Sequence, residues 1–263
     1  MEAALQVRDL CKTYVTNKRQ NNVLKNVTFT VEKGEMVAVM GPSGSGKSTL
    51  LYCVSGMDRP TAGEVLLGEQ KITGLSEKNL AEARLHEMGF IFQQMHMLKN
   101  LTILDNIVLP AYQAGKRNRT RQEMDEYGRS LMRKFEISEI ADRDIMEVSG
   151  GQLQRACICR SLINHPEILF ADEPTGALNR GSSDEVMREL NRCNADGMTI
   201  LLVTHDMKVA SKCSRILYIV DGNIEGELSL GMLPQKTGEV LEETPVFRER
   251  ERKVNCWLND LGW

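Results

Sequence analysis

Two segments near the start of the chain alternate between apolar and polar residues, as half-buried β-strands do. Residues 5–10 and 27–31 follow this period of two, and the polar stretch 16–22 between them is typical of a turn. Such alternation suits an antiparallel pair, because antiparallel strands can face water on one side. We therefore predict an antiparallel β layer at the N-terminus.

The later apolar runs do not alternate. Residues 37–39, 168–171 and 200–203 are continuously apolar, as parallel strands covered on both faces are. Between residues 82 and 149 the pattern becomes helical and highly charged. These patterns predict an α/β protein with a mainly parallel sheet, an N-terminal antiparallel β layer and an inserted helical subdomain.

The same patterns predict the domain organisation. We expect a domain at 1–230, made of an α/β core at 1–84 and 156–230 and a helical subdomain at about 85–155, then a C-terminal extension at 231–263. In the extension, Val254, Trp257, Leu258 and Leu261 fall on one face of a helix. An amphipathic helix of this kind docks either on its own domain or on a membrane or partner, and the stripe leaves both open.

Charge and hydropathy narrow the function classes. The 263 residues carry a formal net charge of −3, so no overall positive field indicates a nucleic-acid partner. The longest apolar runs are far shorter than the ~20 residues of a membrane-spanning helix, and the N-terminus lacks a basic region followed by an apolar one. We expect a cytosolic protein that does not bind nucleic acid.

The seven cysteines are scattered and odd in number, which is not typical of a disulfide framework. Cys157 and Cys159 form a C-x-C pair, but no second Cys or His pair stands nearby at a metal-site spacing. We expect reduced thiols and no structural metal.

A glycine-rich loop directly follows the apolar run 36–40. It fits the pattern G-x-x-x-x-G-K-[ST] and consists of Gly41, Pro42, Ser43, Gly44, Ser45, Gly46, Lys47 and Ser48. In such a loop backbone N–H groups converge on phosphates, Lys47 adds a positive charge, and the Ser48 hydroxyl can join a Mg²⁺ shell. The helix expected from Thr49 onward directs its positive N-terminus at the same phosphates. The chain is predicted to bind a nucleoside triphosphate with Mg²⁺.

Two strand ends carry further candidate chemistry. The apolar strand 168–171 ends in Asp172 and Glu173. Beside the phosphate loop, Asp172 can reach the Mg²⁺ shell through water, and Glu173 can take a proton from the attacking water. The strand 199–204 ends at His205, which lies at the same sheet edge and can hold both the γ-phosphate and the water. These side chains predict hydrolysis of the bound triphosphate.

A second anion site is expected where Ser149, Gly150, Gly151 and Gln152 precede the helical run 153–162. The serine and the N–H groups of the two glycines lie at a helix N-terminus, which favours anions. This site lies on the inserted subdomain, so we do not expect it to close over the phosphate loop of its own chain. Two copies related by a two-fold axis can lend it to each other, which gives an isologous dimer with two composite sites.

In this order, the motifs resemble those of the nucleotide-binding subunits of ATP-binding-cassette transporters. The resemblance covers about residues 5–230 and implies the fold of that family's ATPases. Residues 41–48 resemble the Walker A motif, 168–172 resemble Walker B, with Glu173 as the catalytic glutamate, and 148–152 resemble the signature motif. The ligands implied are ATP and Mg²⁺.

The resemblance also assigns single residues. His205 resembles the switch histidine, and Tyr14 resembles the aromatic residue that stacks on adenine. Gln93 resembles the loop glutamine that touches Mg²⁺ and the water and reports to the membrane subunit, with the adjacent Gln94 as the alternative. The run 93–98 is then either a Met-rich docking surface for a permease helix or ordinary interior packing. The implied partners are a second copy of the chain and an integral-membrane permease at the cytoplasmic face of the membrane.

The stretch 172–179 narrows the resemblance to the macrolide-exporter and lipoprotein-releasing group, and within it to the bacitracin-export type of antimicrobial peptide resistance. Two residues depart from the family pattern. Val148 stands where Leu is usual, and Asn179 stands where the D-loop commonly ends in Asp, so a cross-dimer hydrogen bond there would use a neutral amide.

Three alternatives remain open at this point. A soluble cassette ATPase of DNA repair or translation usually carries a long coiled-coil insertion or a second cassette, and neither is visible in this length. A module that binds ATP without hydrolysing it is disfavoured by Glu173 and His205. A P-loop kinase would have no use for the second anion site at Ser149.

Overall fold

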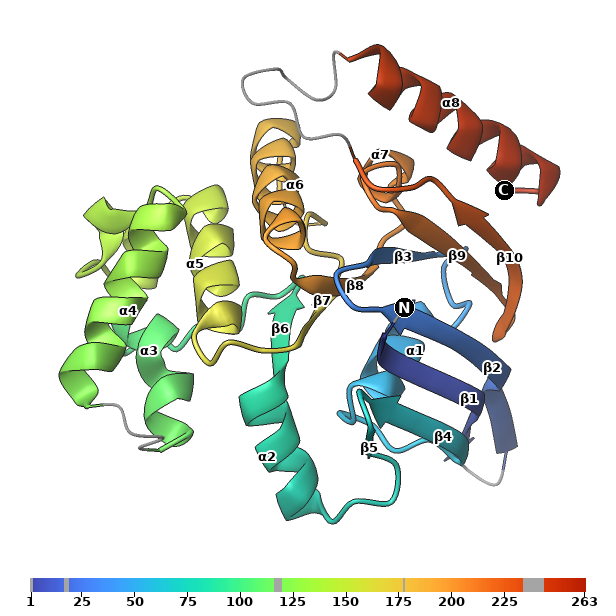
Figure 1. The fold of residues 1–263 in the computed structure, drawn as a ribbon, viewed down its shortest axis with the longest axis horizontal. Coiled ribbons are helices and arrows are strands. Elements are labelled where there is room, and N and C mark those ends of the chain that lie inside the picture. The colour runs from blue at the N-terminus through green and yellow to red at the C-terminus, as the bar shows by residue number, and fades with distance from the viewer. Residues whose placement is uncertain (1, 17–18, 116–119, 177, 234–243) are drawn as a thin grey trace. The chain divides into compact units, whose positions relative to one another are not determined.

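The chain divides into two units after Leu75 and after Leu190: unit 1 is Met1–Leu75 with Asn191–Trp263, and unit 2 is Ser76–Leu190. The computed structural model describes residues 2–16, 19–115, 120–176, 178–233 and 244–263 (Figure 1). Residues 156–190, which we assigned to the α/β core, fall in unit 2 because the strand they contain pairs with another strand of that unit. The domain bounds drawn from the sequence stay a prediction.

The antiparallel β layer belongs to unit 1. Its strands run in the order β2 (Arg19–Glu32), β1 (Ala3–Thr16), β4 (Ala62–Leu67) and β5 (Gln70–Lys71). Leu5 lies opposite Val31 and Val7 opposite Phe29, and all four side chains are buried. The alternation seen in the sequence therefore marks the buried face of this layer.

The turn that we predicted at residues 16–22 is wrong in extent. Residues 19–22 belong to β2, where Tyr14 pairs with Asn21 and Thr16 pairs with Arg19. The two strands continue here as an arm of mostly exposed residues. Because this arm has no buried face, its strands need no apolar alternation, and the pattern could not reveal them.

The strand that leads into the phosphate loop also lies in unit 1, together with three neighbouring strands. Their order is β10 (Asn223–Ser229), β9 (Arg215–Val220), β3 (Met36–Met40) and β8 (Thr199–Val203). β3 pairs in parallel with both β8 and β9, while β10 is antiparallel to β9. Every residue of β3 and β8 is buried, which confirms the prediction of covered parallel strands.

Unit 2 contains a group of helices and two parallel strands. In chain order these are α2 (Glu77–Glu87), β6 (Met88–Phe92), α3 (Ile103–Gln113), α4 (Arg121–Lys134), the short 3-10 helices η1 (Ser138–Ile140) and η2 (Ile145–Glu147), α5 (Gly150–Leu162), β7 (Ile168–Asp172) and most of α6 (Arg180–Ala195). β6 pairs in parallel with β7, and α3 packs against α4 and α5. At Gly128 of α4 a Cβ would lie 2.6 Å from Val108 Cγ1, so glycine permits the close approach of α3. Within the described ranges no helix is long and apolar enough to cross a membrane.

The C-terminal helix α8 (Pro245–Asp260) begins at the Thr244 cap and packs on unit 1 (Figure 1). Val254 and Leu258 of its apolar stripe are buried, and the Trp257 ring meets Tyr218 of β9 edge-on with centroids 6.1 Å apart. In this structure the stripe therefore docks on its own unit.

A buried arginine, Arg250, also attaches this helix to unit 1 through hydrogen bonds. The Arg250 guanidinium donates to four backbone carbonyls, those of Ser211 (2.9 Å), Leu230 (3.1 Å), Gly231 (3.0 Å) and Cys213. Burial lowers the pKa of Arg250, and no carboxylate pairs with it in the described part of the chain. The dipoles of these backbone carbonyls therefore stabilise the buried positive charge.

We expect Arg250→Ala to lower the free energy of unfolding by about 3 kcal/mol, because four carbonyls lose a charged donor and some stay buried. Urea denaturation measures the change. Arg252→Ala, on the exposed face of the same helix, is the matched control and should cost less than about 0.5 kcal/mol. Equal losses in the two variants would contradict the role of Arg250.

Candidate nucleotide-binding site

The phosphate loop connects the end of β3 to α1 (Lys47–Val54). Gly46 is the residue before the helix, with φ of 102°, in the left-handed region that favours glycine. No side chain caps α1 at this end. The N–H groups of its first turn, which have no partners within the helix, are therefore the donors that the loop offers to an anion.

The interior of the loop holds two further donors. Ser45 Oγ is buried and has no hydrogen-bond partner among the described groups. Lys47 Nζ donates to the carbonyls of Gly41 (2.8 Å) and Pro42 (2.9 Å), which holds the ammonium across the loop. At Gly41 a Cβ would lie 2.0 Å from Ile219 O, so only glycine fits there. A buried hydroxyl without a partner and a nearby ammonium form a donor set suited to phosphate oxygens.

His205 lies in the same unit, just beyond the end of β8. Val203 pairs with Val39, and Thr204 N donates to Val39 O at 3.1 Å, so the strand brings the histidine level with the start of the phosphate loop. Asp206 N donates to Thr204 Oγ1 at 3.0 Å and holds the turn that carries the imidazole. The His205 side chain is exposed.

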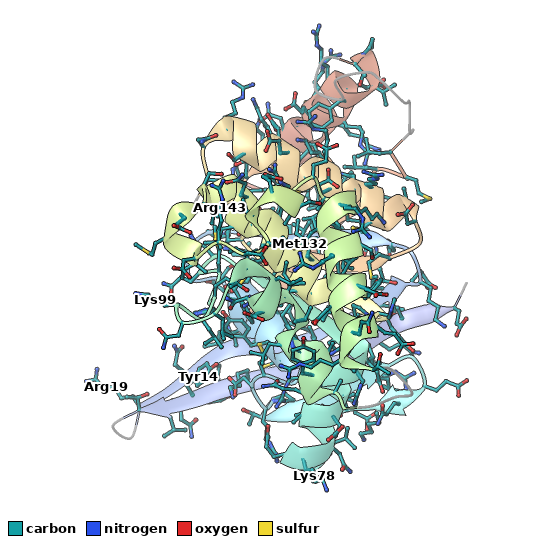
Figure 2. All side chains as sticks on the ribbon, turned by 90° about the vertical axis from the view of Figure 1, so that its left-hand side faces the viewer. Tyr14, Arg19, Lys78, Lys99, Met132 and Arg143 are labelled. Carbon is teal, nitrogen blue, oxygen red and sulfur yellow. The ribbon has the colours of Figure 1, made fainter. Side chains whose placement is uncertain are left out.

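Tyr14 lies on the exposed arm of β1, whose tip is marked by Arg19 in Figure 2. Its hydroxyl donates to Asp58 Oδ2 at 2.6 Å, and Lys12 Nζ lies 4.6 Å from the ring centroid. Burial and the hydrogen bond to Asp58 raise the pKa of Tyr14 to about 12. The phenol therefore stays protonated at neutral pH. Its hydrogen bond to Asp58 fixes the hydroxyl edge of the ring.

The strand-end carboxylates lie in unit 2, next to Gln93. Asp172 is buried and pairs with Phe92, so Gln93 and Glu173 are the next residues along two adjacent parallel strands. Glu173 has φ of 48°, unusual for a residue with a side chain, and Gly176 N closes its turn by donating to Glu173 O at 3.0 Å. A Cβ at Gly176 would lie 2.9 Å from Gln93 Nε2, so the amide against this turn is that of Gln93.

The second predicted anion site is the N-terminus of α5. Ser149 Oγ accepts from Gln152 N at 3.3 Å, and Gln152 Oε1 accepts from Ser149 N at 3.0 Å, which together form a capping box. The cap occupies the N–H of Gln152, so those of Gly150 and Gly151 are the ones suited to an anion. At Gly151 a Cβ would lie 3.0 Å from Ser182 Oγ, so glycine also lets α6 approach.

Sequence reasoning missed two polar residues of α5 that hold the surrounding segments. Gln154 is buried and donates to Pro174 O at 2.8 Å, which ties α5 to the turn after Glu173. Arg160 donates to Met95 O at 2.6 Å and to His96 O at 2.9 Å, which ties α5 to the segment after Gln93. Long polar side chains on a helix whose neighbours are apolar were the available signal.

The segment 93–98 itself is anchored by its backbone. Asn106 is buried; its Oδ1 accepts from Leu98 N at 2.7 Å, and its Nδ2 donates to Leu98 O at 3.1 Å. The side chain of Leu98 is 51% exposed, whereas Met95 and Met97 are partly buried. Both interpretations of this run, a docking surface and interior packing, stay open.

Within the stretch 172–179, Ala177 lies outside the described residues. Asn179 Oδ1 accepts from Ser182 N at 3.0 Å and so caps the start of α6. An amide and a carboxylate both fill this capping role well. The cross-dimer hydrogen bond expected of Asn179 stays a prediction.

The residues assigned to Mg²⁺ fit that ion chemically. Ser48 in unit 1 and Gln93 and Asp172 in unit 2 supply hydroxyl, amide and carboxylate oxygens, the hard donors that Mg²⁺ prefers. Among the described residues no group of three His, Cys, Asp or Glu could hold a metal. Each of these oxygens is of the type that Mg²⁺ accepts when phosphates and water supply its other ligands.

Comparison with known proteins adds a family and relatives. The family model described as ABC transporter matches residues 24–176. The chain is 41% identical over 230 residues to the bacitracin export ATP-binding protein BceA of Halalkalibacterium halodurans, covering 87% of this chain and 90% of that protein. It is 40% identical over 222 residues to the macrolide export ATP-binding/permease protein MacB of a Shewanella species, covering 84% of this chain and 34% of that protein. The chain thus spans about a third of this macrolide exporter.

Two solved structures show the same fold. One is the dimer of the ATP-binding cassette MJ0796 in a post-hydrolysis state, bound to ADP and Pi; the other is a dimeric structure of the same cassette. Each has a TM-score of 0.80 and 36% sequence identity, and covers 87% of this chain and 100% of the other.

Proposed function

Since this chain belongs to the ABC transporter family, we propose that it is an ATP-hydrolysing motor subunit that couples MgATP-driven closure of a dimer to a membrane permease. The observation that carries the proposal is the presence, in different units, of two helix N-termini whose chemistry suits an anion. One is the uncapped N-terminus of α1 with the buried Ser45 hydroxyl, and the other is the N-terminus of α5 at Ser149. A nucleotide bound at the phosphate loop of one copy needs the N-terminus of α5 from another copy to complete its site.

Each residue has a defined task in this reaction. Lys47 and the loop N–H groups hold the β- and γ-phosphates, and Glu173 accepts the proton of the attacking water. His205 donates to the γ-phosphate, and Gln93 orients the water beside Glu173. Mg²⁺, when bound, neutralises charge that develops on the phosphate oxygens. The strained backbone of Glu173 supports this assignment, because such conformations cluster at functional sites.

The second half of each site comes from another copy of the chain. Ser149 and the two glycines after it bind the γ-phosphate held by the partner's phosphate loop, so ATP joins the two copies. After hydrolysis the γ-phosphate leaves, this bond is lost and the copies separate. The MJ0796 dimers, at 36% identity, support a dimeric arrangement.

The motion reaches a permease through the segment after Gln93, and the chain is held at the cytoplasmic face of the membrane by that permease. Helix α5 supports this route, because Gln154 contacts the Glu173 turn and Arg160 contacts Met95. Closure of a site therefore moves the segment that meets the permease. The relative named as an ATP-binding/permease protein supports a permease partner.

The cargo is inferred from one relative. The bacitracin export protein is matched over 90% of its length, which favours export of, or resistance to, antimicrobial peptides. No residue described above would touch the transported molecule, so this part rests on similarity. A soluble ABC ATPase of DNA repair or translation is the alternative.

The test is co-expression of the chain with a candidate permease from the same genome. We expect the two to purify together and the ATPase rate of the complex to exceed that of the isolated chain. If the chain hydrolyses ATP but binds no permease, the soluble ATPase is favoured.

A further inference from the structure

The Asp58 carboxylate in unit 1 binds both the Tyr14 hydroxyl and the ammonium group that lies over the Tyr14 ring. Asp58 Oδ2 accepts from the Tyr14 hydroxyl at 2.6 Å, and Asp58 Oδ1 accepts from Lys12 Nζ, also at 2.6 Å. The same ammonium lies 4.6 Å from the Tyr14 ring centroid, in the range of a cation–π contact. Asp58 thus fixes the Tyr14 hydroxyl and also the Lys12 ammonium that lies over the ring.

The lysine of this cluster is buried, unlike most lysines. Lys12 is 8% exposed, and its third contact is to Arg59 O at 2.7 Å. Burial by itself raises the pKa of Asp58, but the hydrogen bonds from Lys12 and Tyr14 outweigh this and lower it. Lys12 and Tyr14 are two residues apart on β1, so both lie on one face of the strand. The Lys12–Asp58 ion pair therefore fixes the base of the β1–β2 arm, whose exposed residues have no apolar core to pack on.

The cluster is tied to the helix that carries the phosphate loop. Asp58 follows α1 closely, and Asp58 N donates to Tyr52 O at 3.0 Å, which attaches it to the last turn. Because Lys47 begins the same helix, α1 sets the distance between the phosphate loop and the Tyr14 ring.

We propose that Asp58 and Lys12 are positioning residues that hold Tyr14 as a stacking platform for the nucleotide base, at a distance set by α1. This inference rests on the proposed function, in which Tyr14 stacks on adenine. With its edge bound and Lys12 over one face, the ring offers its opposite face to the base. The ligand class is a nucleoside di- or triphosphate, since stacking tolerates any base. Neither residue touches the reacting phosphate.

The test is a double-mutant cycle on the affinity for ADP, which the protein does not hydrolyse, measured by titration calorimetry. Tyr14→Ala should weaken ADP about tenfold, a typical loss for one base-stacking ring. Asp58→Ala should weaken it about threefold to fivefold in the wild-type background and by less than about 1.5-fold in the Tyr14→Ala background. Asp58→Asn keeps an acceptor for the hydroxyl and should lose less. For Asp58→Ala the KM for ATP should rise in step with the loss of ADP affinity, while kcat at saturating ATP should change far less, because Asp58 does not touch the reacting phosphate.

The matched control is Glu64→Ala, which removes a carboxylate paired with Lys71 between β4 and β5 of the same sheet. Its ADP affinity should equal that of the wild type. An equal loss on Asp58→Ala in both backgrounds would indicate a purely structural role and overturn the inference. If Tyr14→Ala has no effect while Lys47→Ala weakens ADP, the platform is wrong but nucleotide binding stands. If Lys47→Ala also has no effect, the proposed function itself fails.

Discussion

The substitution Glu173→Gln is expected to lower the ATP turnover rate by about 10²- to 10⁴-fold, the usual contribution of a general base. Glutamine keeps the size of the side chain and can adopt the same backbone, so the turn closed by Gly176 should survive. Its amide cannot accept a proton from water at neutral pH. The loss should therefore fall on hydrolysis and leave ATP binding intact.

A second consequence separates this base from a residue that merely stabilises the fold. If hydrolysis separates the two copies, Glu173→Gln should accumulate an ATP-bound dimer. Phosphate release measures turnover, and light scattering with and without MgATP measures the dimer. A turnover rate close to that of the wild type would remove Glu173 from the role of base.

The matched control for this experiment is Glu167→Gln. Glu167 is exposed and directly precedes β7, at the opposite end of the strand from Glu173. The same chemical change there should leave turnover within about twofold, since surface substitutions rarely disturb a fold. Loss of activity in both variants would point to a general effect of charge.

Mixing two inactive variants should restore activity. A Lys47→Ala chain lacks a working phosphate loop, and a Ser149→Arg chain lacks the second anion site. In a mixed dimer one composite site combines the intact loop of one chain with the intact Ser149 of the other. With random pairing and independent sites, the mixture should reach about a quarter of the wild-type rate, although each variant alone is inactive.

Two measurements keep this result interpretable. The Ser149→Arg chain should still bind ADP, because its own phosphate loop is intact, and this shows that losing the cap of α5 has not unfolded it. Differently tagged chains show whether mixed dimers form. If mixed dimers form and no activity returns, the two anion sites do not act across the dimer, and the composite site is refuted.

The two sites differ in how they are prepared for an anion. No side chain caps α1, and Ser45 Oγ lacks a protein partner among the described groups, so neither that hydroxyl nor a helix cap has to be displaced for a phosphate to approach this loop. The N-terminus of α5 is already capped by Ser149 and Gln152. To use its hydroxyl on a phosphate, Ser149 must exchange one hydrogen bond for another. The phosphate loop is therefore expected to bind first.

Local features of this chain could be read from the order of its residues. The phosphate loop, the strand end at Glu173 and the helix start at Ser149 each depend on a few consecutive residues, whose backbone and capping preferences are local. Continuous apolar runs likewise identified the parallel strands, since a strand buried on both faces must be apolar throughout. Family membership followed from the same local motifs in their order.

Contacts between distant residues depended on the fold. The amide of Gln93, rather than that of Gln94, lies against the Glu173 turn because Phe92 pairs with Asp172. Tyr14 and Asp58 are 44 residues apart in sequence and meet only because β1 packs beside α1. Strand register and packing decide such pairs, and neither composition nor periodicity records them. The sequence pattern did not predict the polar arm of β1 and β2, because a strand without a buried face leaves no hydrophobic pattern.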